Sequence, residues 1–386
     1  MKANWRIDDD ERMLRESVAA LGRSFGPDYF LAHARSHEHT EELWQAAAES
    51  GFVGVNLPEE HGGGGMGIRE LAIVAEEFAA TGAPLMMIVV SSAICGSVIA
   101  RFGSAQQQAS WLPGVASGDR IFAFAITEPD AGSNSHELAT RAVRSGDEWV
   151  LNGQKYYITG VDIADHVLVV ARTGTDDETG RGELSLFVVD TDAEGLTKQQ
   201  IPVALSLPER QYTLYFDDLR LGDDRLVGTA GDGLRQVFAG LNPERILGAA
   251  LANGVARYAL ERAAGYACDR EVWGVPIGTH QGLAHPLAES YVDVELARMM
   301  TTAAARDYDA GRDAGMASNV AKLAAADAAI TAVDRAMQAH GGNGLSEEYG
   351  IAEFWSLARF LKTAPVSREM VLNHVAERGL GLPRSY

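Results

Sequence analysis

The sequence predicts a multidomain α+β protein in which a helical region is followed by a β region and then by a second helical region. The hydrophobic spacing changes twice, from helical to strand-like near residue 122 and back to helical near residue 230. The chain has 386 residues, 46% of them hydrophobic and 22% charged, which suits two or three globular domains and excludes wholesale disorder. We therefore expect domains at residues 1–121, 122–229 and 230–386.

The first region is predicted to be helical. EELWQAAAESG (41–51) and RELAIVAEEFAATG (69–82) place apolar residues three and four apart, and both end in glycine, as helices commonly do. Residues 78–100 carry no charge and are long enough to cross a bilayer. Gly82, Pro84 and Gly96 interrupt them and no basic flank marks a cytoplasmic side, so we expect a buried helix and no membrane span.

The middle region is predicted to be an antiparallel β domain. EWVLNGQKYYIT (148–159) has two apolar runs around Asn152-Gly153, which predicts a hairpin turn at that pair. HVLVVA (166–171), LSLFVVD (184–190) and YTLYFD (212–217) are further expected strands. In the last region, long alanine-rich helical patterns at 247–270, 287–311 and 317–342 predict a domain like a four-helix bundle.

Charge and cysteine content narrow the possible partners. The net charge of −20 disfavours nucleic acid and acidic membrane surfaces as ligands. Two cysteines are too few to stabilise a chain of this length through disulfide bonds. They indicate a reducing compartment, so we expect a cytoplasmic protein. The cluster HEHTE (37–41) is typical of a solvated helix face, and we predict no metal site. The glycines of HGGGGMG (61–67) match a dinucleotide-binding spacing, but no βαβ alternation surrounds them.

Sequence motifs that follow one another in a fixed order resemble those of a known protein family. LPEEHGGGGMG (57–67), FAITEPDAGSN (124–134), GQKYYITG (153–160), DREVWGVPIGTHQ (269–281) and QAHGGNG (338–344) occur along the chain. On these motifs the chain resembles the acyl-CoA dehydrogenases over nearly its whole length. The resemblance implies that family's three-domain fold, FAD as cofactor, and oxidation of an acyl-CoA to the 2,3-enoyl-CoA. It also implies transfer of electrons to an electron-transfer flavoprotein and a homotetramer built as a dimer of dimers.

The resemblance assigns cofactor residues to two groups. In the chain's own site, Tyr157 replaces the family's usual tryptophan but keeps an aromatic face, and Thr159 matches a threonine near flavin N5. The neighbouring subunit's FAD would be reached by residues of the last region, where Trp273 replaces a common phenylalanine. The implied cofactor residues are Phe124, Ile126, Thr127, Gly132, Ser133, Tyr157, Thr159 and Ser367, together with Arg270, Trp273, Gln281, Gln338 and Gly342.

The catalytic base poses a separate question. Many relatives carry a glutamate in a C-terminal loop where this chain has Pro365, which has neither a carboxylate nor an N–H to polarise the thioester. Isovaleryl-CoA dehydrogenase carries its base on a helix, at a position matched here by Glu244 in Leu241-Asn242-Pro243-Glu244-Arg245. We expect Glu244 to remove the α-proton while a β-hydride passes to flavin N5. Asn242-Pro243-Glu244 is also a typical helix start, which leaves a capping role open.

The resemblance implies substrate contacts by Ser133, Asn242 and Arg245, and part of the acyl wall would come from residues 85–100. A base moved off the C-terminal loop leaves room beside the α-carbon, which weakly favours a branched or cyclic acyl group. Three alternatives remain: an acyl-CoA oxidase of the same fold, a non-dehydrogenating member, and a non-enzymatic protein that binds FAD or acyl-CoA.

Overall fold

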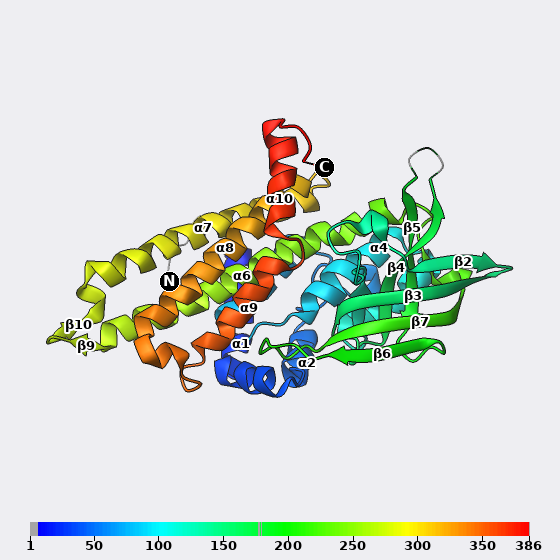
Figure 1. The fold of residues 1–386 in the computed structure, drawn as a ribbon. Coiled ribbons are helices and arrows are strands. Elements are labelled where there is room, and N and C mark those ends of the chain that lie inside the picture. Colours follow the sequence, from blue (N-terminus) through cyan, green and yellow to red (C-terminus); the bar gives the residue numbers. More distant parts are fainter. Residues whose placement is uncertain (1–6, 177, 179, 386) are drawn as a thin grey trace.

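The computed structural model describes residues 7–385 except 177 and 179. Helices from both ends of the chain lie together on one side of the molecule, and the β-sheet lies on the other (Figure 1). The order helical, β, helical predicted from the hydrophobic spacing is confirmed.

The first N-terminal helices lie against the C-terminal helices, whereas the later ones, between residues 88 and 117, cover one face of the sheet. Residues 78–100, expected as one buried helix, are divided by the bend at Gly82–Pro84, and a buried π-helical segment begins only at Ile88. Within the described residues, no helix has both the length and the apolar character needed to cross a bilayer. The elements are α1 (Asp9–Ser36), α2 (Glu41–Glu49), η1 (Glu59–His61), α3 (Ile68–Ala80), η2 (Ile88–Gly96), α4 (Ser97–Phe102) and α5 (Ala105–Ser117).

The middle region forms one sheet with the order β6-β7-β3-β2-β4-β5-β8, and β1 pairs with β4. The expectation of a wholly antiparallel sheet is wrong at two places, because β1 and β2 both pair with β4 in parallel. β1 follows directly from the helical region rather than from a hairpin, so its direction is free to match that of β4. The strands are β1 (Phe122–Ala125), β2 (Arg141–Ser145), β3 (Glu148–Thr159), β4 (His166–Thr175), β5 (Gly182–Asp190), β6 (Leu196–Ile201), β7 (Gln211–Gly222) and β8 (Leu226–Val227).

The predicted hairpin at Asn152-Gly153 is wrong, since β3 continues through both residues. The hairpin lies earlier, where Ser145 pairs with Glu148. At Gly153 the register of β3 against β7 shifts, and a Cβ there would lie 2.6 Å from Thr140 Cα. The glycine is therefore required by a close backbone approach and not by a turn.

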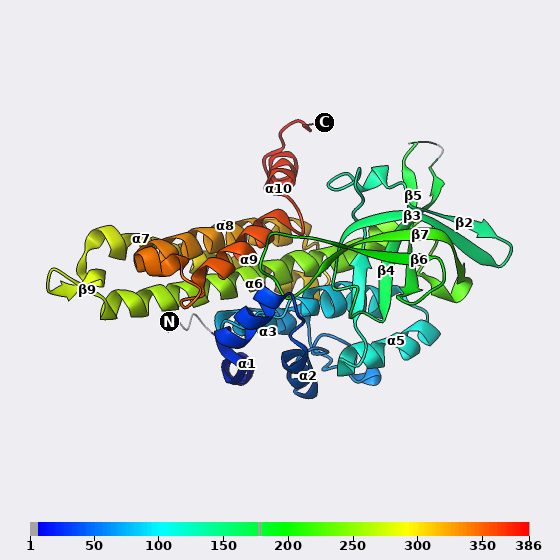
Figure 2. The ribbon, with the colours of Figure 1, turned by 60° about the horizontal axis from the view of Figure 1, so that its bottom comes forward.

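The C-terminal helices pack side by side along the length of the molecule, with α1 and α3 against them, while α10 projects from the body (Figures 1 and 2). One apolar core joins residues of α1, α2 and α3 to residues of α6, α7, α8 and α9. A second core fills the space between η2, α4, α5 and one face of the sheet. The elements are α6 (Gly233–Asp269), β9 (Glu271–Val272), β10 (Val275–Pro276), η5 (Ile277–Thr279), α7 (Gln281–Asp309), α8 (Gly315–His340), η6 (Gly341–Leu345), α9 (Ile351–Thr363), α10 (Arg368–His374) and η7 (Val375–Gly379), with η3 (Ser135–Glu137) and η4 (Asp223–Arg225) in the β region.

Candidate functional site

The first part of the site is the middle of α6. This helix begins at Gly233 and continues through Pro243, so the alternative that Asn242-Pro243 starts a helix is wrong. The Asn242 side chain does not cap a helix but accepts a hydrogen bond from Arg245 at 3.0 Å. Glu244 therefore lies inside a long helix rather than in a first turn, where a carboxylate would serve the helix dipole.

Glu244 has an environment that perturbs its ionisation. Its side chain is only partly accessible to solvent, and the protein around it removes hydration from the charged form. This desolvation raises the pKa of Glu244 to about 7, although the positive charges of Arg245 and Lys322 act in the opposite direction. A carboxylate that titrates near neutrality is suited to general-base catalysis.

The loop after α9 packs beside Glu244. The Ala364–Pro365 peptide bond is cis. A Cβ on Gly248 would lie 3.6 Å from Pro365 Cδ, so Pro365 lies over α6 four residues beyond Glu244. Residues four apart share one face of a helix. The fold therefore brings the loop position, where many relatives carry their base, close to the position occupied here by Glu244.

The π-helical segment η2 lies against α6 and β1. Cys95 is fully buried, and the nearby negative charge of Glu244 adds to the desolvation that raises the pKa of the thiol. Ser91 accepts a hydrogen bond from the backbone N–H of Phe122 at 3.1 Å. π-helical turns are often found at functional sites.

A second wall is formed by the end of β1 and by β3. Lys155 is completely buried and donates to the carbonyl of Ile126 at 2.9 Å and to Glu128 at 2.8 Å. The backbone N–H of Tyr156 donates to the carbonyl of Thr127 at 2.8 Å. These bonds fix the segment after β1 against β3, and Phe124 is buried within β1.

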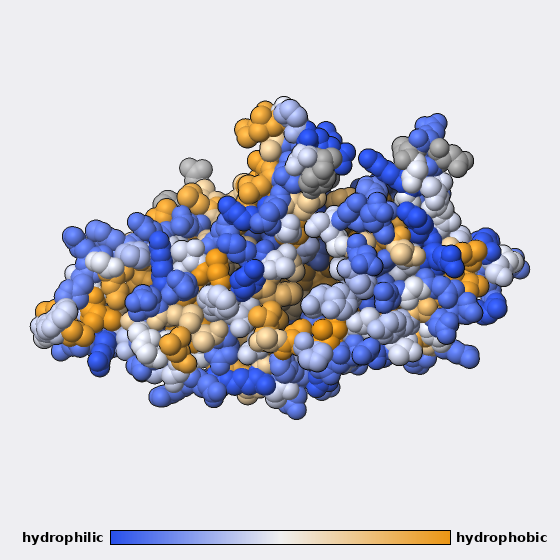
Figure 3. Space-filling view, in the orientation of Figure 1, coloured by the Kyte–Doolittle hydropathy of each residue, from blue (hydrophilic) through white to orange (hydrophobic). Residues whose placement is uncertain are grey.

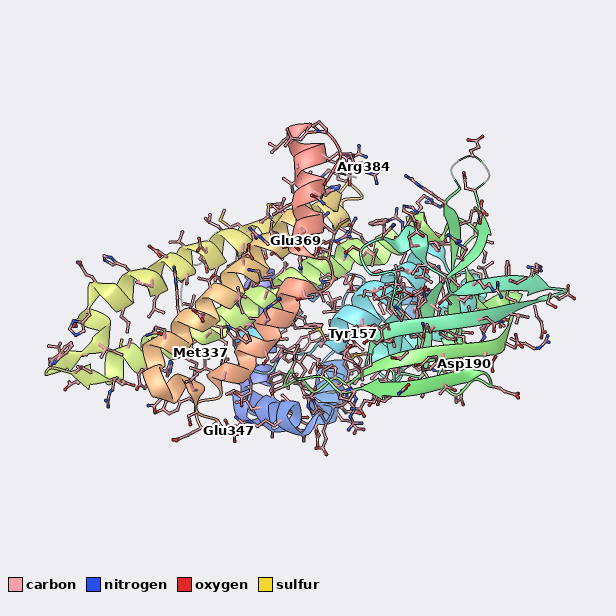
Figure 4. All side chains as sticks on the ribbon, in the orientation of Figure 1. Tyr157, Asp190, Met337, Glu347, Glu369 and Arg384 are labelled. Carbon is pink, nitrogen blue, oxygen red and sulfur yellow. The ribbon has the colours of Figure 1, made fainter. Side chains whose placement is uncertain are left out.

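Two side chains of β3 on this wall carry an aromatic face and a hydroxyl. Tyr157 has a φ of 57° and is 52% exposed, and its ring lies 4.4 Å from that of Tyr156. Backbone in the left-handed region is uncommon for a bulky residue and is frequent at functional sites. Tyr157 lies where the sheet meets the helices (Figure 4). Thr159 donates its hydroxyl to Gln211 at 3.0 Å, which leaves the lone pairs of the hydroxyl available.

The segment with Gly132 and Ser133 is followed by His136, which lines a groove of about 420 Å³. The groove lies between the β region and the C-terminal residues from α10 onward. The surface is hollowed between α10 and the sheet (Figure 3). Burial, assisted by the charges of Arg181 and Arg384, lowers the pKa of His136, whose Nδ1 is buried with no hydrogen-bond partner among the described residues. The groove is lined by His136, Phe238, Met370, Asn373, His374, Glu377, Arg378, Arg384 and Ser385.

The other group of predicted cofactor residues lies elsewhere. The hairpin of β9 and β10 is at the end of the helical layer remote from the sheet, and Met337, which precedes Gln338, is also on that side (Figures 1 and 4). Trp273 is 88% exposed. The fold of one chain therefore does not bring Arg270, Trp273, Gln281, Gln338 and Gly342 together with Thr127, Tyr157 and Thr159. Ser367 belongs to the loop near Glu244, where it caps α10 by accepting from the Met370 N–H.

Three family models cover most of the chain. The N-terminal, middle and C-terminal domains of acyl-CoA dehydrogenase match residues 8–119, 123–219 and 231–380. The chain belongs to the acyl-CoA dehydrogenase family. It is 54% identical over 383 residues to acyl-CoA dehydrogenase FadE12 of Mycobacterium tuberculosis, covering 98% of each chain. It is 33% identical to (2S)-methylsuccinyl-CoA dehydrogenase of Cereibacter sphaeroides, covering 96% of this chain and 70% of that protein. The structure of butyryl-CoA dehydrogenase from Megasphaera elsdenii superposes with a TM-score of 0.92 at 25% identity, covering 98% and 100% of the chains.

As a member of this family, the protein is a flavoprotein oxidoreductase that uses FAD in acyl-CoA metabolism. The residues present fit the cofactor. The hydroxyls of Thr127, Ser133 and Thr159 suit its polar groups, the exposed ring of Tyr157 offers a stacking face, and the space beside Gly132 is open. In the structure, Lys155 and Gln211 brace these residues, and Lys322 holds the loop beside Glu244.

Sequence reasoning missed Lys155, Gln211, Lys322 and the cations of the groove. Lys155 and Lys322 stand inside predicted strand and helix patterns, where a lysine is normally expected to face solvent. A lysine within a buried stretch is the one signal that would have singled them out.

Proposed function

We propose that the enzyme oxidises an acyl-CoA thioester to the 2,3-enoyl-CoA and that Glu244 removes the α-proton. The observation that carries this proposal is the carboxylate of Glu244, desolvated to a pKa of about 7 on the helix face covered by the Pro365 loop. The proton moves from the substrate α-carbon to Glu244. Bound FAD supplies the acceptor for the hydride that leaves the β-carbon. Thr127, Thr159 and Tyr157 would orient the ring, and an electron-transfer flavoprotein is the proposed electron acceptor.

Pro365 has no backbone N–H, so it cannot donate a hydrogen bond to the thioester carbonyl. Another group of the protein has to polarise that carbonyl. Within the described part of the chain, the backbone N–H groups of Val366 and Ser367 have no hydrogen-bond partner. We propose that one of these two amides donates to the thioester oxygen. A donor of this kind contributes about 10²–10³ in rate.

The groove lined by His136, which follows Ser133 by three residues, is the proposed path of the CoA phosphates. His136, Arg378 and Arg384 provide cationic or hydrogen-bonding groups at its rim, although the whole protein carries a charge of −20. Arg245 and Asn242, linked to each other near Glu244, are the proposed contacts for the pantetheine end.

A branched or cyclic acyl group is the proposed substrate class. The base lies on α6 instead of the loop, which leaves space beside the α-carbon. The similarity to a dehydrogenase named for methylsuccinyl-CoA supports an α-branched chain.

We also propose a homotetramer in which the remote hairpin completes the cofactor site of a second copy. The 88% exposure of Trp273 and the position of the β9–β10 hairpin, at the end of the helical layer remote from the sheet, support this arrangement. The unpaired cysteines Cys95 and Cys268 support a reducing compartment such as the cytoplasm.

The test of the base is Glu244→Gln. This change keeps shape and removes the proton acceptor, so anaerobic bleaching of the flavin by a panel of straight, branched and cyclic acyl-CoA thioesters should be lost while FAD stays bound. Bleaching at the wild-type rate would refute the assignment. Rapid reoxidation of the bleached wild-type enzyme by air would favour the oxidase alternative, and thioester binding without bleaching by any member of the panel would favour a non-dehydrogenating or non-enzymatic relative.

A further inference from the structure

Lys322 is a buried cation in α8 whose position has a consequence for Glu244. Its side chain is 2% exposed. Its ammonium donates to the carbonyl of Lys362 at 3.1 Å and to the carbonyl of Val366 at 2.6 Å. Among the described residues, no carboxylate comes within ion-pair distance of it. These two carbonyls accept two of its three protons but do not neutralise its charge, so its field extends to neighbouring groups.

The two carbonyls lie on either side of the Pro365 loop. Lys362 is in the last turn of α9, where carbonyl groups have no partner within the helix, and Val366 follows Pro365. A single ammonium therefore ties the start of the loop to its end. The same loop packs over α6 at Gly248 and leads to Ser367, the N-cap of α10.

The charge of Lys322 acts on Glu244. Burial lowers the pKa of Lys322 to about 8, while Asp327 of its own helix, Glu244 of α6 and Glu369 near the start of α10 oppose that change. Arg245 of α6 has the same sign as Lys322, and both favour the charged form of Glu244. Cys95 of η2 is the further titratable group near Glu244. Removing the positive charge of Lys322 should therefore raise the pKa of Glu244.

We infer that Lys322 is a positioning residue for proton abstraction, which fixes the loop of residues 364–367 over α6 and supplies a positive charge that favours ionised Glu244. The inference rests on the proposed role of Glu244 as base. It predicts that the charge of residue 322 sets the pH at which the substrate α-proton can be removed.

The experiment measures α-proton removal without turnover. The probe is the 3-thia analogue of the acyl-CoA that bleaches the wild-type holoenzyme fastest, because sulfur at the β-position leaves no hydride to transfer. Its enolate beside the oxidised flavin is followed by long-wavelength absorbance between pH 5.5 and 9. The variants are Lys322→Gln, which keeps a donor and loses the charge, Lys322→Met, and Lys322→Arg, which keeps the charge. Lys362→Met is the matched control, since it removes a neighbouring side-chain charge that pairs with Asp327.

We expect the midpoint of enolate formation to move up by about 0.5–1 pH unit in Lys322→Gln and Lys322→Met, and to stay near the wild-type value in Lys322→Arg and Lys362→Met. If Lys322→Met does not fold, Lys322→Gln decides the question. An unchanged midpoint in Lys322→Gln overturns the inference. If Glu244→Gln still forms the enolate band, the proposed base is wrong and the inference falls with it. If Glu244→Gln lacks the band while the Lys322→Gln midpoint is unchanged, only the inference is wrong.

Discussion

At the scale of single residues, the ionisation of Glu244 affects both its proposed role as a base and the free energy of unfolding. In the unfolded chain its carboxyl titrates near 4.5, whereas desolvation in the fold raises its pKa to about 7. The folded state therefore binds the proton more tightly, and the wild-type protein loses stability as the pH rises from about 4.5 to about 7. A base held ready in this way reduces stability at the pH where it works.

Replacing Glu244 by Gln should raise stability at pH 8 by about 1–3 kcal/mol, because the amide carries no charge to desolvate. The gain should shrink as the pH falls and vanish below about pH 4.5. Urea unfolding at several pH values measures this difference. Glu261→Gln, at an exposed position of the same helix, is the control and should show no such trend. A gain that is independent of pH would contradict the prediction.

At the scale of elements, the pair of Lys155 and Glu128 joins the segment after β1 to β3. Glu128 also accepts from the N–H groups of Ala139 and Thr140 at 2.6 and 3.0 Å, so one buried carboxylate holds three segments together. The ammonium of Lys155 has a pKa lowered to about 8 by burial, against the opposing charge of Glu128. Such a pair fixes geometry more than it adds stability.

Lys155→Met should destabilise the protein by about 3–5 kcal/mol, because it leaves Glu128 buried without its counter-charge. The variant should also retain less FAD, since Ile126 and Thr127 lose their brace. Adding Glu128→Gln should restore part of the stability, as a double-mutant cycle by urea unfolding would show. Additive losses in the double variant would mean that the two side chains are not coupled.

The strand β3 shows what a local sequence pattern can and cannot predict. Its alternation predicted strand structure correctly on both sides of Asn152-Gly153, but the pair was misread as a turn. Asn152 instead exchanges two hydrogen bonds with Asp218 on β7, and Gly153 makes room for Thr140. Both partners lie outside β3, so the pattern of its twelve residues alone could not distinguish a bulge from a turn.

At the scale of the whole molecule, α7 carries an apolar stripe on its outer face. Val292, Leu296 and Met299 are 53%, 60% and 59% exposed and lie four and three residues apart. Residues at this spacing share one helix face, and a cluster of exposed apolar side chains marks an association surface. This stripe is a proposed contact of the homotetramer.

Leu296→Lys should break the assembly into smaller species without unfolding the chain, because a charge would be buried in an apolar contact. Sedimentation velocity gives the mass, and flavin absorbance gives the FAD content, which should fall if the β9–β10 hairpin completes a second copy's site. Val143→Lys, an equally exposed position on β2 with 55% exposure, is the matched control and should keep the wild-type mass. Full assembly of Leu296→Lys would exclude the stripe from the interface.

The sequence by itself determined the order of the helical and β regions, because hydrophobic periodicity is a local property of helices and strands. Its motifs also pointed to the family and, with Pro365 in the usual place of the base, to Glu244 as the substitute. Only the tertiary structure decided that Glu244 is inside a helix, desolvated, and covered by the Pro365 loop that Lys322 holds. The ionisation of a carboxylate depends on the atoms and charges that surround it in space. Around Glu244 the charge of Arg245 is adjacent in sequence, but Lys322 on α8, the packing of η2 and the Pro365 loop come from distant parts of the chain.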